Sequence, residues 1–79
     1  MTTSKNDRRF IQIGLKVSYY RKLRGMTQEE LAEKVDLNAR YLSRVESPKF
    51  VQPISLKTLF AIADACRVSP HCFLLFDEE

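Results

Sequence analysis

Residues 27–47 read Thr-Gln-Glu-Glu-Leu-Ala-Glu-Lys-Val-Asp-Leu-Asn-Ala-Arg-Tyr-Leu-Ser-Arg-Val-Glu-Ser, and the expected fold follows from this stretch. It opens with a capping box: the Thr27 hydroxyl can accept a hydrogen bond from the backbone of Glu30, while the Glu30 carboxylate reaches back to the backbone of Thr27. The box predicts a short helix over about 28 to 35.

The second half of the stretch predicts a tight turn and another short helix. Asp36 and Leu37 form the turn, and Asn38 can cap a helix over 39 to 47. A helix of about eight residues is unstable alone in water, so the two helices must brace each other at a steep angle. We therefore expect a helix-turn-helix unit over about 28 to 47, whose second helix can enter the major groove of DNA.

Apolar residues outside this unit also recur with helical spacing, and no sustained alternation suggests a sheet. We expect a first helix over 7 to 24 closed by Gly25, a fourth over 55 to 67 and a fifth over 70 to 76. The fourth helix should turn these side chains inward: Leu56, Leu59, Phe60, Ala63 and Cys66. The fold class predicted is all-α, a compact five-helix domain.

The chain has 79 residues, room for one domain with a single small core. We expect a polar and basic flexible arm over 1 to 8, the DNA-binding domain over 9 to 76, and an acidic tail over 77 to 79. No apolar run is long enough to span a bilayer, and the first residues contain no apolar signal segment. These features favour a cytoplasmic protein that does not contact a membrane.

The charge is unevenly distributed along the chain. Residues 1 to 49 hold 11 Lys and Arg against 6 Asp and Glu, whereas residues 50 to 79 hold 2 against 4. This asymmetry hints at a polyanionic partner. Cys66, His71 and Cys72 would leave a zinc ion without a fourth ligand, and no base stands near a nucleophile. We therefore expect no metal, no cofactor and no enzymatic activity.

The helix over 39 to 47 divides into an inward and an outward side when residues are spaced by about 100°. The inward side carries Leu42, Val45 and Glu46, and the outward side carries Arg40, Ser43, Arg44 and Ser47. An outward side with two guanidinium groups, hydroxyls and no acid suits a groove lined with acceptors and phosphates. The other reading is an ordinary solvated helix face.

Residues 13 to 76 resemble the Cro and lambda-repressor-like helix-turn-helix transcriptional regulators of phages and bacteria. The resemblance rests on Ile13-Gly14, Arg21-Lys-Leu-Arg-Gly-Met-Thr-Gln-Glu-Glu-Leu-Ala32, Tyr41-Leu-Ser-Arg-Val-Glu46 and Ser55-Leu-Lys-Thr-Leu59. Two positions depart from the family: Asp36 stands where Gly is usual in the turn, and Pro48 stands near a usual Gly. Asp tolerates a left-handed backbone better than most residues, so the turn should form.

The resemblance implies a DNA-binding transcription regulator, expected to be a repressor, that binds a two-fold symmetric operator on double-stranded DNA as a homodimer. It implies no small-molecule ligand. The candidate DNA-binding residues are Gln28, Asn38, Ala39, Arg40, Tyr41, Ser43, Arg44 and Lys49. A protein-interaction module of the same fold, such as an antitoxin that binds a toxin, is the alternative function.

Among these candidates we expect a division of labour. Arg40 and Arg44 should read bases, whereas Gln28, at the positive end of a helix dipole, should hold a phosphate together with Lys49. Tyr41 could either contact phosphate or pack at the rim of the core. Both arginines could instead grip phosphates.

Two further expectations concern structure. Arg21 and Glu46 lie beside the core stripes of their helices and should form a structural ion pair, as the resembling repressors do at these positions. The apolar run after Ser69-Pro70 should mediate dimerisation through Phe73, Leu75 and Phe76; the other reading is that the domain buries this run internally.

Overall fold

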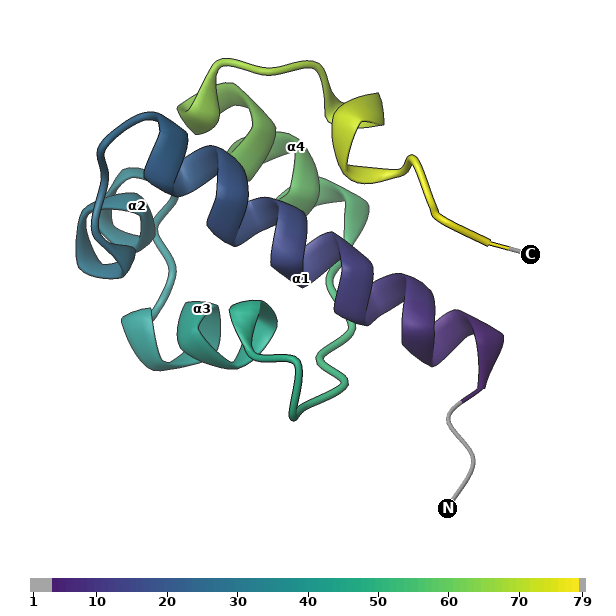
Figure 1. Ribbon diagram of the computed structural model, residues 1–79. Coiled ribbons are helices and arrows are strands. Elements are labelled where there is room, and N and C mark those ends of the chain that lie inside the picture. The colour runs from purple at the N-terminus through teal and green to yellow at the C-terminus, as the bar shows by residue number, and fades with distance from the viewer. Residues whose placement is uncertain (1–3, 79) are drawn as a thin grey trace.

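The computed structural model describes residues 4–78, which form an all-α domain without strands. The chain runs through four α-helices and ends with a 3-10 helix: α1 (Lys5–Leu23), α2 (Gln28–Lys34), α3 (Ala39–Glu46), α4 (Leu56–Cys66) and η1 (Pro70–Phe73). Figure 1 shows α2 and α3 as a compact pair beside the long α1, while α4 packs against both α1 and α2, and η1 against α1 and α4. The helix-turn-helix is therefore built onto a scaffold of α1 and α4.

One hydrophobic core joins every element. Its buried members are Ile13, Val17, Leu31, Ala32, Leu42, Val45, Leu59, Ile62, Ala63, Cys66 and Phe73. Each of the short helices α2 and α3 contributes two apolar side chains to this core, because each is amphipathic and too short to be stable alone. The core therefore fixes the angle between the two helices.

Three helices end with the same left-handed cap. Gly25 (φ 72°), Asp36 (φ 55°) and Arg67 (φ 59°) follow α1, α2 and α4. After α2, the Leu37 N–H donates to the Ala32 carbonyl over 2.8 Å, which closes a Schellman motif. Asp36 therefore makes the expected turn in the conformation where Gly is more common, and α3 begins shortly after it.

The C-terminal segment differs from the expected fifth helix over 70 to 76. The helical part is the 3-10 helix Pro70–Phe73, after which the chain is irregular. The residues that follow bind to α1 instead: the Asp77 backbone N–H donates to the Gln12 amide oxygen, and Glu78 pairs with Arg9 at 3.1 Å. The chain beyond Phe73 is thus held along α1 and does not continue the helix, so the five-helix prediction is wrong in its last element.

The expected flexible arm over 1 to 8 is wrong for the part of it that the structure describes. Ser4 caps α1 with a capping box that it shares with Asp7, so helix begins at Lys5 and residues 5 to 8 are not an arm. The remaining expected arm residues, 1 to 3, lie outside the described residues, as does residue 79 of the tail. On α4, the predicted inward side is wrong at both Leu56 and Phe60, which are exposed, because the core lies on the Leu59 and Ala63 side.

The contact between α1 and α3 depends on Gly14. A Cβ atom at Gly14 would overlap the backbone carbonyl oxygen of Val45. The missing side chain therefore lets the backbones of α1 and α3 approach closely, and it determines the distance between the two helices. In the part of the chain that the structure describes, no helix is long and apolar enough to cross a membrane.

Candidate nucleic-acid interface

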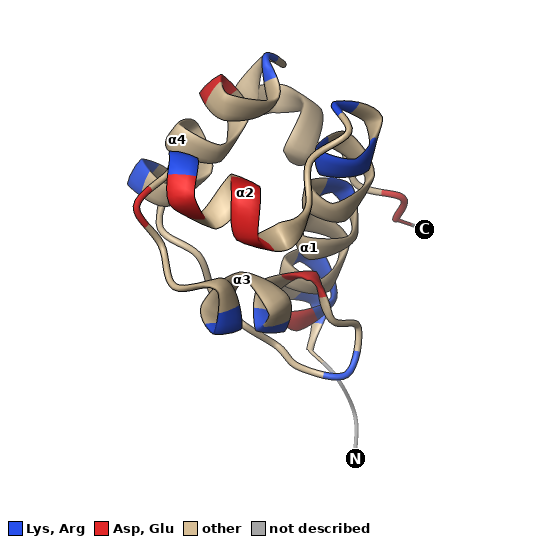
Figure 2. Ribbon diagram, turned by 90° about the vertical axis from the view of Figure 1, so that its left-hand side faces the viewer, with Lys and Arg blue, Asp and Glu red and all other residues tan. Residues whose placement is uncertain are grey.

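Helix α3 lies at the surface with one side buried and the other open. Leu42 and Val45 point into the core, whereas Arg40, Ser43 and Arg44 are exposed. Figure 2 shows the basic residues of α3 on the side that faces away from α1 and α2. The outward side therefore presents guanidinium groups and a hydroxyl to any ligand.

The start of α3 is fixed by Asn38. Its side-chain oxygen accepts a hydrogen bond from the Arg40 backbone N–H at 2.7 Å, so this oxygen serves as the helix cap. Ala39, the first helical residue, is half-buried.

The acidic residue of α3, Glu46, is turned inward and neutralised. Arg21 Nε and Nη2 each donate to its carboxylate over 2.8 Å, and both residues are 7% exposed. The predicted pair is thus a bidentate buried ion pair, and its hydrogen bonds raise the pKa of Arg21. Arg21 Nη1 also donates to the Met26 carbonyl over 2.7 Å, which ties α1, the α1–α2 turn and α3 together.

Gln28 belongs to the same network. Its Nε2 donates to Glu46 Oε1 over 3.1 Å, and the residue is half-buried at the first position of α2. The sequence predicts a phosphate ligand at this position and gives no sign of the bond to Glu46. Spacing within the chain could not reveal it, because the two residues are 18 positions apart.

Arg44 and Phe50 form a contact that the sequence does not predict. The Arg44 guanidinium carbon lies 4.8 Å from the centre of the Phe50 ring, and Phe50 is 46% exposed. Phe50 belongs to the loop after α3, whose path the sequence leaves open. No periodic signal marks an aromatic residue in a loop as the neighbour of a helix residue.

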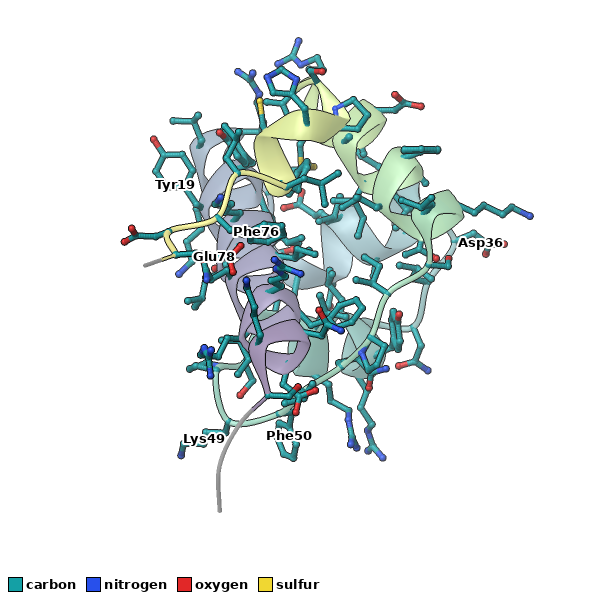
Figure 3. The ribbon with its side chains drawn as sticks, turned by 90° about the vertical axis from the view of Figure 1, so that its right-hand side faces the viewer. Tyr19, Asp36, Lys49, Phe50, Phe76 and Glu78 are labelled. Carbon is teal, nitrogen blue, oxygen red and sulfur yellow. The ribbon has the colours of Figure 1, made fainter. Side chains whose placement is uncertain are left out.

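Tyr41 and Lys49 lie at the two ends of α3. The Tyr41 hydroxyl donates to the Pro53 carbonyl over 3.4 Å, and partial burial raises its pKa. Tyr41 therefore packs against the loop that follows α3, while Lys49 is exposed beyond the end of the helix. In Figure 3, Lys49 and Phe50 lie at the same end of the molecule as the start of α1.

The basic start of α1 is partly engaged by the C-terminal tail. Glu78 lies within 3.7 Å of Lys5 and 3.1 Å of Arg9. The ring of Phe76 is approached by Arg9 at 5.8 Å and by Lys16 at 5.6 Å. Figure 3 shows Phe76 and Glu78 lying along α1.

The residues expected at a dimer interface differ in how far the structure buries them. Phe73 is 0% exposed, so its place in a dimer interface is wrong: the ring packs edge-on against Tyr20 inside the core. Phe76 is half-buried, and Leu75 is 61% exposed. Leu56, Phe60 and Leu74 are exposed apolar residues as well, and Leu56 and Leu74 line one apolar groove with Phe76.

Comparisons with known proteins agree with this architecture. Residues 17–71 match the helix-turn-helix family. A crystal structure of SinR, described as the master regulator for biofilm formation, in complex with DNA is 35% identical with a TM-score of 0.72; the match covers 80% of this chain and 98% of that one. The N-terminal DNA-binding domain of SinR from Bacillus subtilis is 34% identical with a TM-score of 0.72, over 85% of this chain and 96% of that one.

A third structure of the same fold is the restriction-modification controller protein C.AhdI from Aeromonas hydrophila. It is 25% identical with a TM-score of 0.73, over 81% of this chain and 94% of that one. A comparison with curated proteins gave no match. The family match covers most of the chain and includes both helices of the α2–α3 unit. The chain therefore belongs to the Cro/C1-type helix-turn-helix family.

Proposed function

We propose that this protein is a DNA-binding transcription regulator that represses by occupying a two-fold symmetric operator as a homodimer. Family membership supports this function, as does the similarity to SinR, which is solved in complex with DNA and as its DNA-binding domain alone. A regulator of this kind acts where bacterial or phage DNA lies, in the cytoplasm. Its partners are double-stranded DNA and a second copy of the chain.

The outward side of α3 is the observation that carries the proposal. Arg40, Ser43 and Arg44 are exposed together, and the one acid of the helix is buried against Arg21. A surface helix with exposed hydrogen-bond donors and a buried carboxylate fits the major groove, where base acceptors lie between two rows of phosphates.

The residues around α3 suggest separate roles. Arg40 and Arg44 can each donate two hydrogen bonds to a guanine, while Ser43, Asn38 and Ala39 can approach neighbouring base edges. Lys49, which is exposed past the end of α3, can reach the phosphate backbone of the DNA. Gln28 can offer its backbone N–H to a phosphate at the start of α2, with its amide oriented by Glu46.

Selection of bound duplexes from a random pool tests the proposed function. The wild-type protein should enrich one motif with two related halves about one helical turn apart. Enrichment of no motif, or equal binding to all duplexes, would contradict sequence-specific recognition.

Variants of the interface then separate base reading from backbone binding. Arg40→Ala or Arg44→Ala should make the free energy of binding less favourable by about 1 to 3 kcal/mol through the contact with one base pair, and the preference for one base at that position should weaken. Lys49→Ala should weaken binding to all sequences alike. It should also reduce the slope of log affinity against log salt concentration by about one. An unchanged motif in both arginine variants would assign the arginines to phosphates.

A second copy of the chain is proposed to cover the apolar residues Leu56, Phe60, Leu74 and Leu75. All four are exposed, and Leu56 and Leu74 line the groove between α1, α4 and the C-terminal segment. Phe60 follows Leu56 by one turn of α4, and Leu75 follows Leu74 in the chain. Clustered exposed apolar side chains of this kind mark interaction surfaces. A dimer would also join two recognition helices, which raises affinity and specificity for a two-fold operator.

A protein-interaction module is the second candidate function. It is favoured by Leu15, Tyr19 and Leu23, which are exposed and follow each other at helical spacing on α1. A toxin gene beside this gene, together with failure to enrich a DNA motif, would support this alternative.

A further inference from the structure

We propose that Phe50 is a specificity-determining residue that positions Arg44 for base reading. The inference rests on the proposed DNA-binding function and extends it to a residue that makes no part of the helix-turn-helix unit. Phe50 would act through Arg44, by holding the guanidinium group at one place on the outward side of α3.

The loop after α3 holds the Phe50 ring close to the helix. The Ser47 hydroxyl accepts from the Lys49 backbone N–H over 3.2 Å, and the Ser47 carbonyl accepts from the Phe50 backbone N–H over 3.4 Å. This turn brings the ring beneath the Arg44 guanidinium, 4.8 Å from its centre to the guanidinium carbon. A separation below about 6 Å over a ring face is the range of cation–π attraction.

The two arginines of the outward side differ in this respect. Within the described residues, the Arg40 guanidinium has no hydrogen bond, ion pair or ring contact, whereas Arg44 has the Phe50 ring. Arg40 must lose its side-chain freedom when it binds, and Arg44 has lost part of it beforehand. Arg44 is therefore the better prepared of the two for the fixed geometry of a bidentate contact.

The contact is strong enough to affect discrimination between bases. Cation–π attraction at exposed sites corresponds to about a two- to fivefold change in an equilibrium, and more when water is excluded. A DNA groove would exclude water from this pair. Loss of the ring should therefore blur the base preference at the position that Arg44 reads and leave other positions unchanged.

Motif selection with four proteins tests this role: wild type, Phe50→Leu, Phe50→Tyr and Val51→Ala. Phe50→Leu keeps an apolar side chain without a ring, Phe50→Tyr restores the ring, and Val51 is an exposed apolar neighbour in the same loop. Phe50→Leu should reduce discrimination at one position about two- to fivefold, while the other two variants keep the wild-type motif. Urea midpoints equal to wild type would show that all variants fold.

The same substitutions in an Arg44→Ala background identify the route of the effect. Arg44→Ala marks the position that Arg44 reads, and Phe50→Leu should have no further effect in that background. A Phe50→Leu effect that persists without Arg44 would mean that the ring contacts DNA itself and would overturn the proposal. An effect spread equally over all positions, or no effect at all, would overturn it as well.

The wild-type selection separates this inference from the function on which it rests. If the wild type enriches no motif, the proposed function fails and the inference fails with it. If it enriches a motif that Phe50→Leu leaves intact, only the role of Phe50 fails.

Discussion

Glu46 accepts hydrogen bonds from three donor atoms on two other helices, and this single carboxylate connects stability to the binding surface. Arg21 and Gln28 hold it inside the domain. A carboxylate exposed on α3 would repel phosphates, whereas the buried one fixes the helix and leaves the outward side basic. The pair also replaces solvation that both charges lose on burial.

Glu46→Ala should lower the free energy of unfolding by about 3 kcal/mol, because it leaves Arg21 buried without its counter-ion. Urea denaturation followed by circular dichroism measures this change. Glu33→Ala, an exposed glutamate of α2, is the control and should unfold near the wild-type midpoint. A wild-type midpoint for Glu46→Ala would contradict the structural role of the pair.

Asp36→Gly should raise the free energy of unfolding by about 1 kcal/mol, because a non-glycine residue in the left-handed region costs about that much or more. Asp36 has φ 55°. Arg67→Gly, at the equivalent cap of α4 with φ 59°, should behave alike, whereas Glu33→Gly inside α2 should lower stability by about 1 kcal/mol. Urea midpoints measure all three changes. A loss of stability in Asp36→Gly would show that the Asp side chain stabilises the turn.

Among the helices, the position of α3 depends on its backbone contact with α1 and on the ends of α2. Gly14 permits the contact with Val45, and Thr27 with Glu30 closes the start of α2. Both features lie away from the outward side of α3, so changes in them should alter stability before they alter base preference.

Gly14→Ala should destabilise the domain by about 3 kcal/mol, because a methyl group would collide with the Val45 carbonyl and force α1 and α3 apart. Gly25→Ala is the matched control: a methyl group there would meet no neighbouring atom within 4 Å, but φ is 72°, so the cost should be about 1 kcal/mol. Thermal and urea unfolding of both variants shows which of them loses more free energy of unfolding. Equal losses would contradict the close approach at Gly14.

The capping box of α2 should make stability depend on pH. Hydrogen bonds from the Thr27 backbone and hydroxyl lower the pKa of Glu30 in the folded protein. The contribution of the ionised Glu30 to the free energy of unfolding is therefore fully present above the ordinary glutamate pKa. It is lost as the pH falls through the lowered pKa of the folded state. In Glu30→Gln, the decline of the urea midpoint between about pH 5 and pH 3 should be smaller than in wild type. Identical profiles for the two proteins would show that other carboxylates dominate.

Across the whole molecule, the C-terminal segment controls which apolar surface stays exposed. Phe73 fills the core, and Glu78 holds the tail on α1. Leu74 and Leu75 are left exposed, and Leu74 lines a groove with Leu56 of α4. The segment therefore both completes the core and borders the surface proposed for the second copy.

Leu75→Asp should shift the protein from dimer to monomer in sedimentation at micromolar concentration, because a charge would be desolvated in the interface. Phe60→Asp should act in the same way. Leu23→Asp, at an exposed apolar residue of α1 that does not line the groove, is the control and should leave the dimer intact. A wild-type protein that is a monomer both free and on DNA would contradict the proposed dimer.

The helix-turn-helix is predictable from the amino-acid sequence because its signals are local. Thr27 with Glu30, Asn38 and the left-handed position of Asp36 act within a few residues, and helical periodicity assigns Leu42 and Val45 to the core. The family pattern also pairs Arg21 with Glu46 across 25 positions, which local spacing alone could not do.

Contacts between segments that have no periodic relation arise only when the chain folds. The Phe50 ring beneath Arg44, the Gln28 bond to Glu46 and the tail along α1 depend on how distant elements meet. The run after Pro70 predicts a helix because it is apolar on most sides. In the folded chain Phe73 fills the core, the helical part ends there, and the residues that follow lie along α1 with Asp77 bonded to Gln12.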